Sequence, residues 1–226
     1  MIRLQGIERI FDVGGQQEHA LRDINLCVER GDYISIMGPS GSGKSTLLNI
    51  IGLLDRPSAG RYEFEQRDIT ALSDNEQAQV RREHIGFVFQ FFHLIPRLTA
   101  AENIELPLVL SGVPTAQRRA RVAQTLKAYG LAERAHHRPE QLSGGQRQRV
   151  AIGRATIIEP GLLLADEPTG NLDRTSGHEV VEILEQLNAR GITLVVVTHD
   201  PELGQRARRR LHMVDGAIVE DMGHGA

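Results

Sequence analysis

The sequence is poor in several features, and each shortage excludes a class of protein. Cys27 is the only cysteine among the 226 residues, which excludes an internal disulfide and a zinc site of several thiolates and fits a reducing compartment. No uncharged apolar run approaches the about 18 residues that span a bilayer, and the first residues lack the apolar core of a signal peptide. We therefore expect that the chain does not cross a membrane by itself.

Neither sign of charge dominates the chain. With 26 basic and 29 acidic residues it has no broad positive field to gather nucleic acid, so we expect no nucleic-acid partner. A local basic cluster is formed by Arg206, Arg208, Arg209 and Arg210. We interpret this cluster as a solvated face and assign it no function.

The rest of the composition is that of a folded globular protein, with 40% hydrophobic and 24% charged residues. No linker, low-complexity tract or internal repeat divides the sequence, so we expect one domain over residues 1–226. Short apolar runs at 33–37, 85–89, 162–165 and 192–197 predict strands covered on both faces, in a mainly parallel sheet. Helical patterns between them indicate an α/β fold.

Local patterns predict further elements. The alternation of Ile24, Leu26 and Val28 predicts a half-buried strand with Cys27 on its other face, without a functional role. A helix is expected over 46–54, another around 122–129, and a third after a capping box formed by Ser176 and Glu179.

Residues 94–158 contain no convincing strand, and we interpret them as a helical subdomain inserted into the sheet. Thr99 and Glu102 form a possible capping box there. Pro107 and Pro114 should break the region into separate helices.

A phosphate-binding loop follows the predicted strand 33–37 and opens a predicted helix. Its residues are Gly38, Pro39, Ser40, Gly41, Ser42, Gly43, Lys44, Ser45 and Thr46. Glycines allow successive backbone N–H groups to point at phosphate oxygens, and the Ser45 hydroxyl can ligate Mg²⁺. Lys44 and Lys127 are the only lysines beside 24 arginines, which indicates that Lys44 supplies a compact charge to the β- and γ-phosphates. The alternative is a plain glycine turn.

Two acidic residues end the apolar strand 162–165. Asp166 and Glu167 should reach the same sheet edge as the phosphate-binding loop, because carboxyl ends of parallel strands meet there. Asp166 could hold Mg²⁺, and Glu167 could orient and deprotonate the water that attacks the γ-phosphate. A solvated acidic strand end is the alternative.

A second anion-facing helix start follows Leu142. Ser143 is placed as its N-cap, Gln146 at the matching capping-box position, and Gly144 and Gly145 leave the backbone open to an anion. Alone, this segment could be an ordinary loop cap. Two anion sites in one chain pose a question, because one nucleotide has one γ-phosphate.

In this order, the phosphate-binding loop, the 142–146 segment and the run 162–173 resemble the ATP-binding subunit of ABC transporters, over roughly residues 2–222. The resemblance implies a phosphate-loop NTPase core with a mainly parallel central sheet, an N-terminal antiparallel β portion and an inserted helical subdomain. It implies ATP and Mg²⁺ as cofactors and ATP hydrolysis as the activity. Two copies pair head to tail in that family, and the signature of one closes over the ATP of the other.

The resemblance also assigns roles to single residues. Gln90 resembles the loop glutamine that touches Mg²⁺ and senses the membrane partner, and His199 the switch histidine that holds the γ-phosphate. Residues 171–173 match the loop that links the two sites, and Phe11 stands where an aromatic residue stacks on adenine. From the residues alone, Gln90 is a loop amide, His199 a surface histidine and Phe11 a core side chain.

The motifs at 98–104, 138–141 and 171–173 are most similar to the macrolide-exporter and lipoprotein-release (MacB/LolD-type) branch. This implies a peripheral location at the cytoplasmic face of the inner or plasma membrane, beside an integral permease subunit whose docking we expect at 91–105. One alternative is an ATPase that signals to cell-wall enzymes without transport. Another is a soluble member acting on DNA or ribosomes, which we disfavour because a coiled-coil interruption, zinc cysteines and a tandem cassette are lacking.

Overall fold

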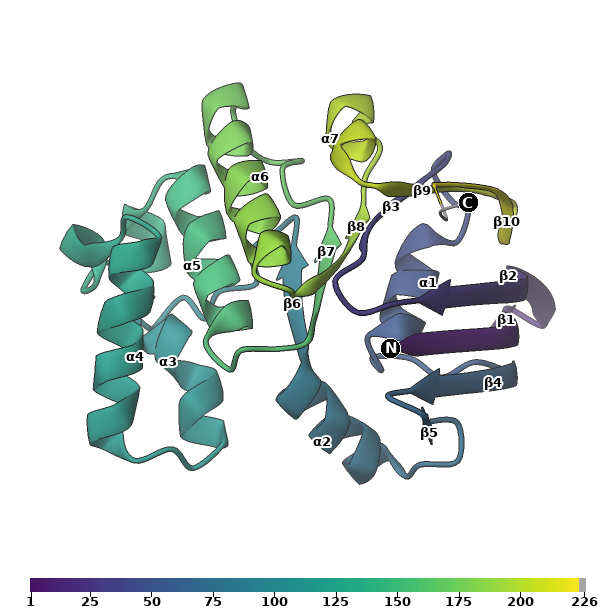
Figure 1. Ribbon diagram of the computed structural model, residues 1–226, viewed down its shortest axis with the longest axis horizontal. Coiled ribbons are helices and arrows are strands. Elements are labelled where there is room, and N and C mark those ends of the chain that lie inside the picture. The colour runs from purple at the N-terminus through teal and green to yellow at the C-terminus, as the bar shows by residue number, and fades with distance from the viewer. Residues whose placement is uncertain (224–226) are drawn as a thin grey trace.

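The computed structural model describes residues 1–223, which form two sheets and the helices around them (Figure 1). The strands are β1 (Ile2–Val13), β2 (Gln16–Val28), β3 (Tyr33–Met37), β4 (Ala59–Phe64), β5 (Arg67–Asp68), β6 (Ile85–Phe89), β7 (Leu162–Asp166), β8 (Thr193–Val197), β9 (Arg209–Val214) and β10 (Ala217–Met222). The α-helices are α1 (Lys44–Ile51), α2 (Asp74–His84), α3 (Ala100–Leu110), α4 (Thr115–Ala128), α5 (Gly144–Thr156), α6 (Arg174–Ala189) and α7 (Pro201–Arg206). Two short 3₁₀ helices are η1 (Ala132–Arg134) and η2 (Pro139–Gln141).

The larger sheet has the order β10-β9-β3-β8-β7-β6, with parallel pairing from β9 to β6 and an antiparallel edge strand β10. The smaller sheet has the order β2-β1-β4-β5 and is antiparallel throughout. These sheets confirm the predicted α/β fold with a mainly parallel central sheet and an N-terminal antiparallel portion. The strands predicted at 33–37 and 85–89 match β3 and β6, and those at 162–165 and 192–197 match β7 and β8 to within one residue.

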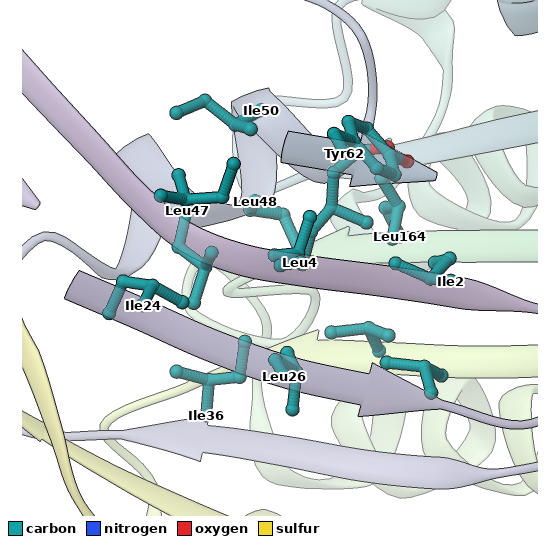
Figure 2. Packing of buried hydrophobic residues seen from close by; sticks show 14 of the residues in the cluster. Ile2, Leu4, Ile24, Leu26, Ile36, Leu47, Leu48, Ile50, Tyr62 and Leu164 are labelled. Carbon is teal, nitrogen blue, oxygen red and sulfur yellow. The ribbon is translucent and has the colours of Figure 1, made fainter. Parts of the chain in front are cut away.

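Helix α1 lies in the core between the two sheets. Its apolar residues, among them Leu47 and Leu48, pack with Leu4 of β1, Ile24 of β2 and Ile36 of β3 in one buried cluster (Figure 2). The predicted half-buried strand lies within β2: Leu26 points into this core, and Cys27 is exposed on the opposite face. The core thereby fixes α1, and with it the loop that precedes α1, against the central sheet.

Strand β7 divides its residues between two cores, as expected of a strand covered on both faces. Leu162 and Leu164 pack on the α1 side, whereas Leu163 and Ala165 pack under α5 and α6, and all four are fully buried. A third core of apolar residues joins α3, α4 and α5, which Figure 1 shows grouped on the side away from β1, β2 and β4. Between Leu94 and Ile158 the structure contains helices and turns alone.

Two capping boxes form where the sequence predicts them. Thr99 caps α3 with Glu102, and Ser143 caps α5 with Gln146. The box predicted at Ser176 is wrong, because Asp173 is the N-cap of α6 and accepts from the Ser176 N–H at 3.0 Å. An aspartate three residues upstream satisfies the same helix end, so the helix begins earlier.

The two prolines act differently. Pro114 is the N-cap position of α4 and separates it from α3, as predicted. Pro107 lies inside α3, so the prediction of a break there is wrong. The proline removes one backbone hydrogen bond near the end of the helix, and the packing of Ile104 and Leu108, which are at most 2% exposed, holds the helix together across it.

The basic cluster near the C-terminus is not one solvated face. Arg208 is exposed and Arg206 pairs with Glu185, but Arg209 is 6% exposed. Its guanidinium contacts the Asp221 carboxylate at 2.8 and 2.6 Å and donates to the Cys27 carbonyl at 2.6 Å. Arg209 therefore joins β9, β10 and β2, and the interpretation as surface charge is wrong for this residue.

Two buried tyrosines provide a matched test of the core. Tyr62 Oη donates to the Ile51 carbonyl at 2.6 Å, whereas the Tyr33 hydroxyl has no hydrogen-bond partner within residues 1–223. We expect Tyr62→Phe to lower the free energy of unfolding by about 1–2 kcal/mol, because it leaves the end of α1 with an unpaired carbonyl. Tyr33→Phe should leave it unchanged or raise it slightly. Urea denaturation measures both, and equal losses in the two variants would contradict this assignment.

Candidate functional site

The register of the parallel strands aligns the ends that carry the predicted site. Phe89 pairs with Asp166, Asp166 with Val197, and Val197 with Ile36. The residues that follow each of these positions therefore emerge at one edge of the sheet. The four strands contribute Gln90, Glu167, the Thr198–His199 pair and the phosphate-binding loop, respectively.

A cavity of about 1230 Å³ opens at this edge. It brings together most of the residues that the sequence predicts for nucleotide binding and hydrolysis. Those lining it are Phe11, Gly38, Ser40, Gly41, Ser42, Gly43, Lys44, Ser45, Thr46, Asp166, Glu167 and His199.

The loop at 38–43 has a shape that requires glycine at two positions. Gly38 and Gly43 have φ values of 147° and 93°, which L side chains rarely adopt. A Cβ at Gly38 would overlap the Met213 carbonyl, and one at Gly43 would overlap the Ala20 carbonyl. These close contacts hold the loop in its curled form, so the reading as a plain turn does not account for the glycines.

The loop carries positive charge at its mouth. Gly43 is the N-cap of α1, which begins two residues before the predicted position 46 and has no side-chain cap on its first N–H groups. These free N–H groups and the helix dipole favour an anion at this point. Lys44 Nζ donates to the carbonyls of Gly38 at 2.9 Å and Pro39 at 2.7 Å, which holds the ammonium over the loop.

Ser45 and Asp166 form a pair of hard oxygen donors. Ser45 Oγ lies 3.4 Å from Asp166 Oδ1. Burial raises the pKa of Asp166 above its ordinary value, and the charge of Glu167 adds to this, while the Ser45 hydroxyl and Lys44 oppose it. No group of three or more acidic, histidine or cysteine ligands occurs within residues 1–223. Two protein oxygens, completed by phosphate and water oxygens, suit Mg²⁺.

Glu167 is held by residues at the end of β8. His199 Nδ1 lies 2.8 Å from Glu167 Oε1, and Thr198 Oγ1 donates to Oε2 at 3.3 Å. The tautomer of His199 that carries its proton on Nδ1 donates this hydrogen bond to Glu167. The Glu167 backbone is strained, with φ +47°. Its N–H donates to the Val197 carbonyl, which holds the backbone in this conformation and so helps to fix the position of the side chain.

The wall of the cavity opposite the phosphate-binding loop comes mainly from β1 and β2. Phe11 lies there with the Arg9 guanidinium 4.3 Å from its ring centroid, and it is part-exposed, not a core residue. The sequence patterns do not predict the rest of this wall. Its residues on β1 and β2 are Asp12, Gln16, Gln17, Glu18, His19, Ala20 and Arg22, and Val197 of β8 and Asp215 after β9 also line the cavity. The polar residues of β2 form no motif, so nothing in the sequence pattern marks them.

Gln90 lies outside this cavity. Its side chain packs against the backbone of Gly170, where a Cβ would be 2.7 Å from Gln90 Nε2. Asn171 Nδ2 donates to the Gln90 carbonyl at 3.0 Å. Gln90 thus contacts the loop after Glu167, and its contact with Mg²⁺ stays a prediction.

The segment Ser143–Gln146 is also absent from the cavity lining. Ser143 Oγ accepts from the Gln146 N–H at 3.2 Å, and Gln146 Oε1 accepts from the Ser143 N–H at 3.0 Å. Ser143 is exposed, and Gly144 lies against Leu172 and Asn171. The helix start therefore faces outward, and the single chain does not bring its two predicted anion sites together.

Comparison with known proteins gives consistent matches. The family model described as ABC transporter matches residues 21–170. The macrolide export ATP-binding/permease protein MacB of Marinobacter nauticus is 49% identical over 99% of this chain and 35% of its own length. A MacB 1/2 protein of Paracoccus denitrificans is 49% identical over 100% of this chain and 34% of its own length. The chain thus spans about a third of the length of these curated relatives.

Solved structures match over the full length of both chains. A dimeric post-hydrolysis state of the ATP-binding cassette MJ0796, bound to ADP and Pi, has a TM-score of 0.93 and 42% identity. A second dimeric structure of MJ0796, titled a bacterial ABC transporter cassette, has a TM-score of 0.93 and 43% identity.

The raised pKa of Asp166 leads to a stability prediction. The folded state disfavours the ionised carboxylate, so its cost is fully present above the raised pKa and disappears as pH falls through that value toward 3.8. Without nucleotide, we expect Asp166→Asn to raise Tm by a few degrees at pH 7, and the gain to shrink on acidification. Thermal unfolding at pH 7 and near pH 4 measures this.

Asp12→Asn serves as the control for that experiment, because Asp12 is exposed and an asparagine oxygen can still accept from the Gly15 N–H. It should change Tm little at either pH. A lower Tm for Asp166→Asn at pH 7 would show that the Asp166 charge stabilises the fold and would contradict the prediction.

Proposed function

The chain belongs to the ABC transporter family, and on this premise we propose that it binds MgATP between two copies of itself and hydrolyses it to drive a membrane permease. The observation that carries the proposal is the separation of its two anion-facing segments. Phosphate-binding loop, Asp166, Glu167 and His199 line one cavity, whereas Ser143–Gln146 lies outside it. A second copy can supply the missing segment.

Nucleotide binding follows from the loop and the start of α1. The N–H groups at the start of α1 face the phosphates, and the Lys44 ammonium exchanges its carbonyl partners for β- and γ-phosphate oxygens. Ser45 and Asp166 would hold Mg²⁺, which when bound neutralises charge on the phosphate oxygens. Phe11 provides an aromatic surface for the adenine at the β1 wall.

Hydrolysis is assigned to Glu167. Each of its carboxylate oxygens accepts one hydrogen bond, from His199 and Thr198, and retains a free lone pair for water. Glu167 accepts a proton as the water oxygen bonds to the γ-phosphorus and the bond to the β–γ bridging oxygen breaks, giving ADP and phosphate. His199, 73% exposed on its side chain, can turn toward the γ-phosphate from the same position.

A second copy completes the site. Ser143 is exposed at the start of α5 and offers a hydroxyl and a helix N-terminus to an anion outside its own chain. The two MJ0796 structures are titled dimeric, and one of them contains ADP and Pi. These observations support a head-to-tail dimer in which each ATP lies between the phosphate-binding loop of one chain and the signature segment, Ser143–Gln146, of its partner.

The membrane partner is proposed to dock beside the loop that follows β6. Phe91 is 69% exposed and Ile95 38% exposed, whereas the Phe92 ring lies under the Arg147 guanidinium. In the part of the chain that the structure describes, no helix has the length and apolar character needed to span a bilayer. The relatives named as export ATP-binding/permease proteins support a permease partner and a role in extrusion. Peripheral attachment at the cytoplasmic membrane face is part of the same proposal.

The assignment of Glu167 is tested by Glu167→Gln. The amide keeps the size of the side chain but cannot accept the water proton, so we expect kcat for ATP hydrolysis to fall about 10²–10⁴-fold. ATP affinity should stay near that of the parent, and ATP should trap a dimer in size-exclusion chromatography. Glu133→Gln, the same change at an exposed surface position, is the control. Hydrolysis by Glu167→Gln at the parent rate would overturn the assignment.

The composite site is tested by complementation between inactive chains. One chain carries Lys44→Ala and the other Ser143→Arg, and each homodimer should lose ATPase activity. A purified mixed dimer has one site with both intact segments, so we expect activity to return. The matched control places both changes in one chain beside a parent chain: a shared site then leaves both positions defective, whereas a site within one chain stays active. Activity in this control, with none in the first mixed dimer, would refute the shared site.

A further inference from the structure

The first turns of α5 pack directly on the loop that follows Glu167. A Cβ on Gly144 would lie 3.3 Å from Leu172 Cδ2, and one on Gly145 would lie 2.7 Å from Ser176 Cβ. Gly145 is buried in this contact. The backbone of Gly144 and Gly145 therefore packs closely against the side chains of Leu172 and Ser176, so the segment Ser143–Gln146 and the segment 168–176 of the same chain are in direct contact.

One polar side chain connects the same two segments. Gln148, fully buried in α5, donates from Nε2 to the Pro168 carbonyl at 2.6 Å. Its Oε1 is buried and has no hydrogen-bond partner within residues 1–223. A buried amide oxygen without a partner destabilises the fold and offsets the stability gained from the bond to Pro168, so stability alone does not account for a glutamine here. Among the described residues, Pro168 is the single hydrogen-bond partner of this amide.

Pro168 is the residue after Glu167. The Glu167 backbone lies at φ +47°, and its carboxylate is placed by contacts to Thr198 and His199. Because Pro168 is bonded directly to Glu167, a shift of the Pro168 carbonyl moves the Glu167 backbone and with it the side chain. On the other side, Gln148 lies five residues after Ser143, within two turns of a continuous helix, so it moves with the signature segment.

We propose that Gln148 is a positioning residue that connects α5, which begins with the signature segment, to the loop after Glu167 in its own chain. This rests on the proposed function. Ser143 of one chain contacts the ATP bound by the partner, and Gln148 transmits the resulting position of α5 to Pro168 and so to Glu167 in its own site. The filled state of one site thereby sets the geometry of the general base in the other.

The first test compares homodimers. Gln148→Leu keeps the volume near that of glutamine, and the lost bond to Pro168 is offset by removal of the unpaired Oε1, so Tm should change little. We expect kcat to fall about tenfold, as for the loss of one hydrogen bond, with KM for ATP unchanged. Gln124→Leu, on the exposed surface of α4, is the matched control. An unchanged kcat in Gln148→Leu overturns the proposal.

The second test locates the effect in a mixed dimer with one hydrolytic site, in which one chain carries Glu167→Gln. Gln148→Leu placed in the chain that keeps Glu167 should lower single-turnover phosphate release. The same change in the other chain, whose signature segment faces the hydrolysed ATP, should not. Equal losses in both arrangements indicate a packing defect, and a loss in the second alone indicates a role at the nucleotide; either result overturns the proposal. A parent homodimer without ATPase activity would instead overturn the proposed function.

Discussion

The parallel register between β6, β7, β8 and β3 is the constraint on which the site depends. It places Phe89, Asp166, Val197 and Ile36 in one row, so residues from four distant parts of the sequence emerge at one sheet edge. Packing of α1 between the two sheets keeps this row next to the phosphate-binding loop. A slip of one residue in β7 would exchange its two buried faces and turn Asp166 away from Ser45. Apolar packing at a distance from Asp166 and Glu167 therefore fixes the positions of the site residues.

Sequence patterns predicted the structure correctly where it depends on residues that are close together in the chain. The apolar runs of β3, β6, β7 and β8 are bounded by turn residues, and the phosphate-binding loop joins a strand directly to a helix. The capping boxes at Thr99 and Ser143 depend on residues three positions apart. Each of these features is decided within a few residues. The order of the motifs then led to the resemblance to a known family, and that resemblance implied a second copy.

Features decided by contacts over long sequence separations could not be predicted in the same way. Arg209 resembled its exposed neighbours in sequence, but it is buried against Asp221 and the Cys27 carbonyl. Asp173 and Ser176 are both good N-caps, and the local pattern does not choose between them. No sequence motif predicts a role for Gln148, because that role depends on its hydrogen bond to Pro168, twenty residues further along the chain. The residues of β2 that line the cavity could not be predicted from the sequence for the same reason.

The Lys44 ammonium already occupies the curled loop through its bonds to the Gly38 and Pro39 carbonyls. The phosphate-binding loop thus keeps its curled shape without a ligand, because Lys44 occupies it. Little conformational entropy is therefore lost when a ligand binds. A ligand must also bind the Lys44 ammonium more strongly than the two carbonyl oxygens do. We expect a polyphosphate with several charged oxygens to displace these carbonyls more readily than a singly charged anion does, so the loop should favour ligands of high charge density.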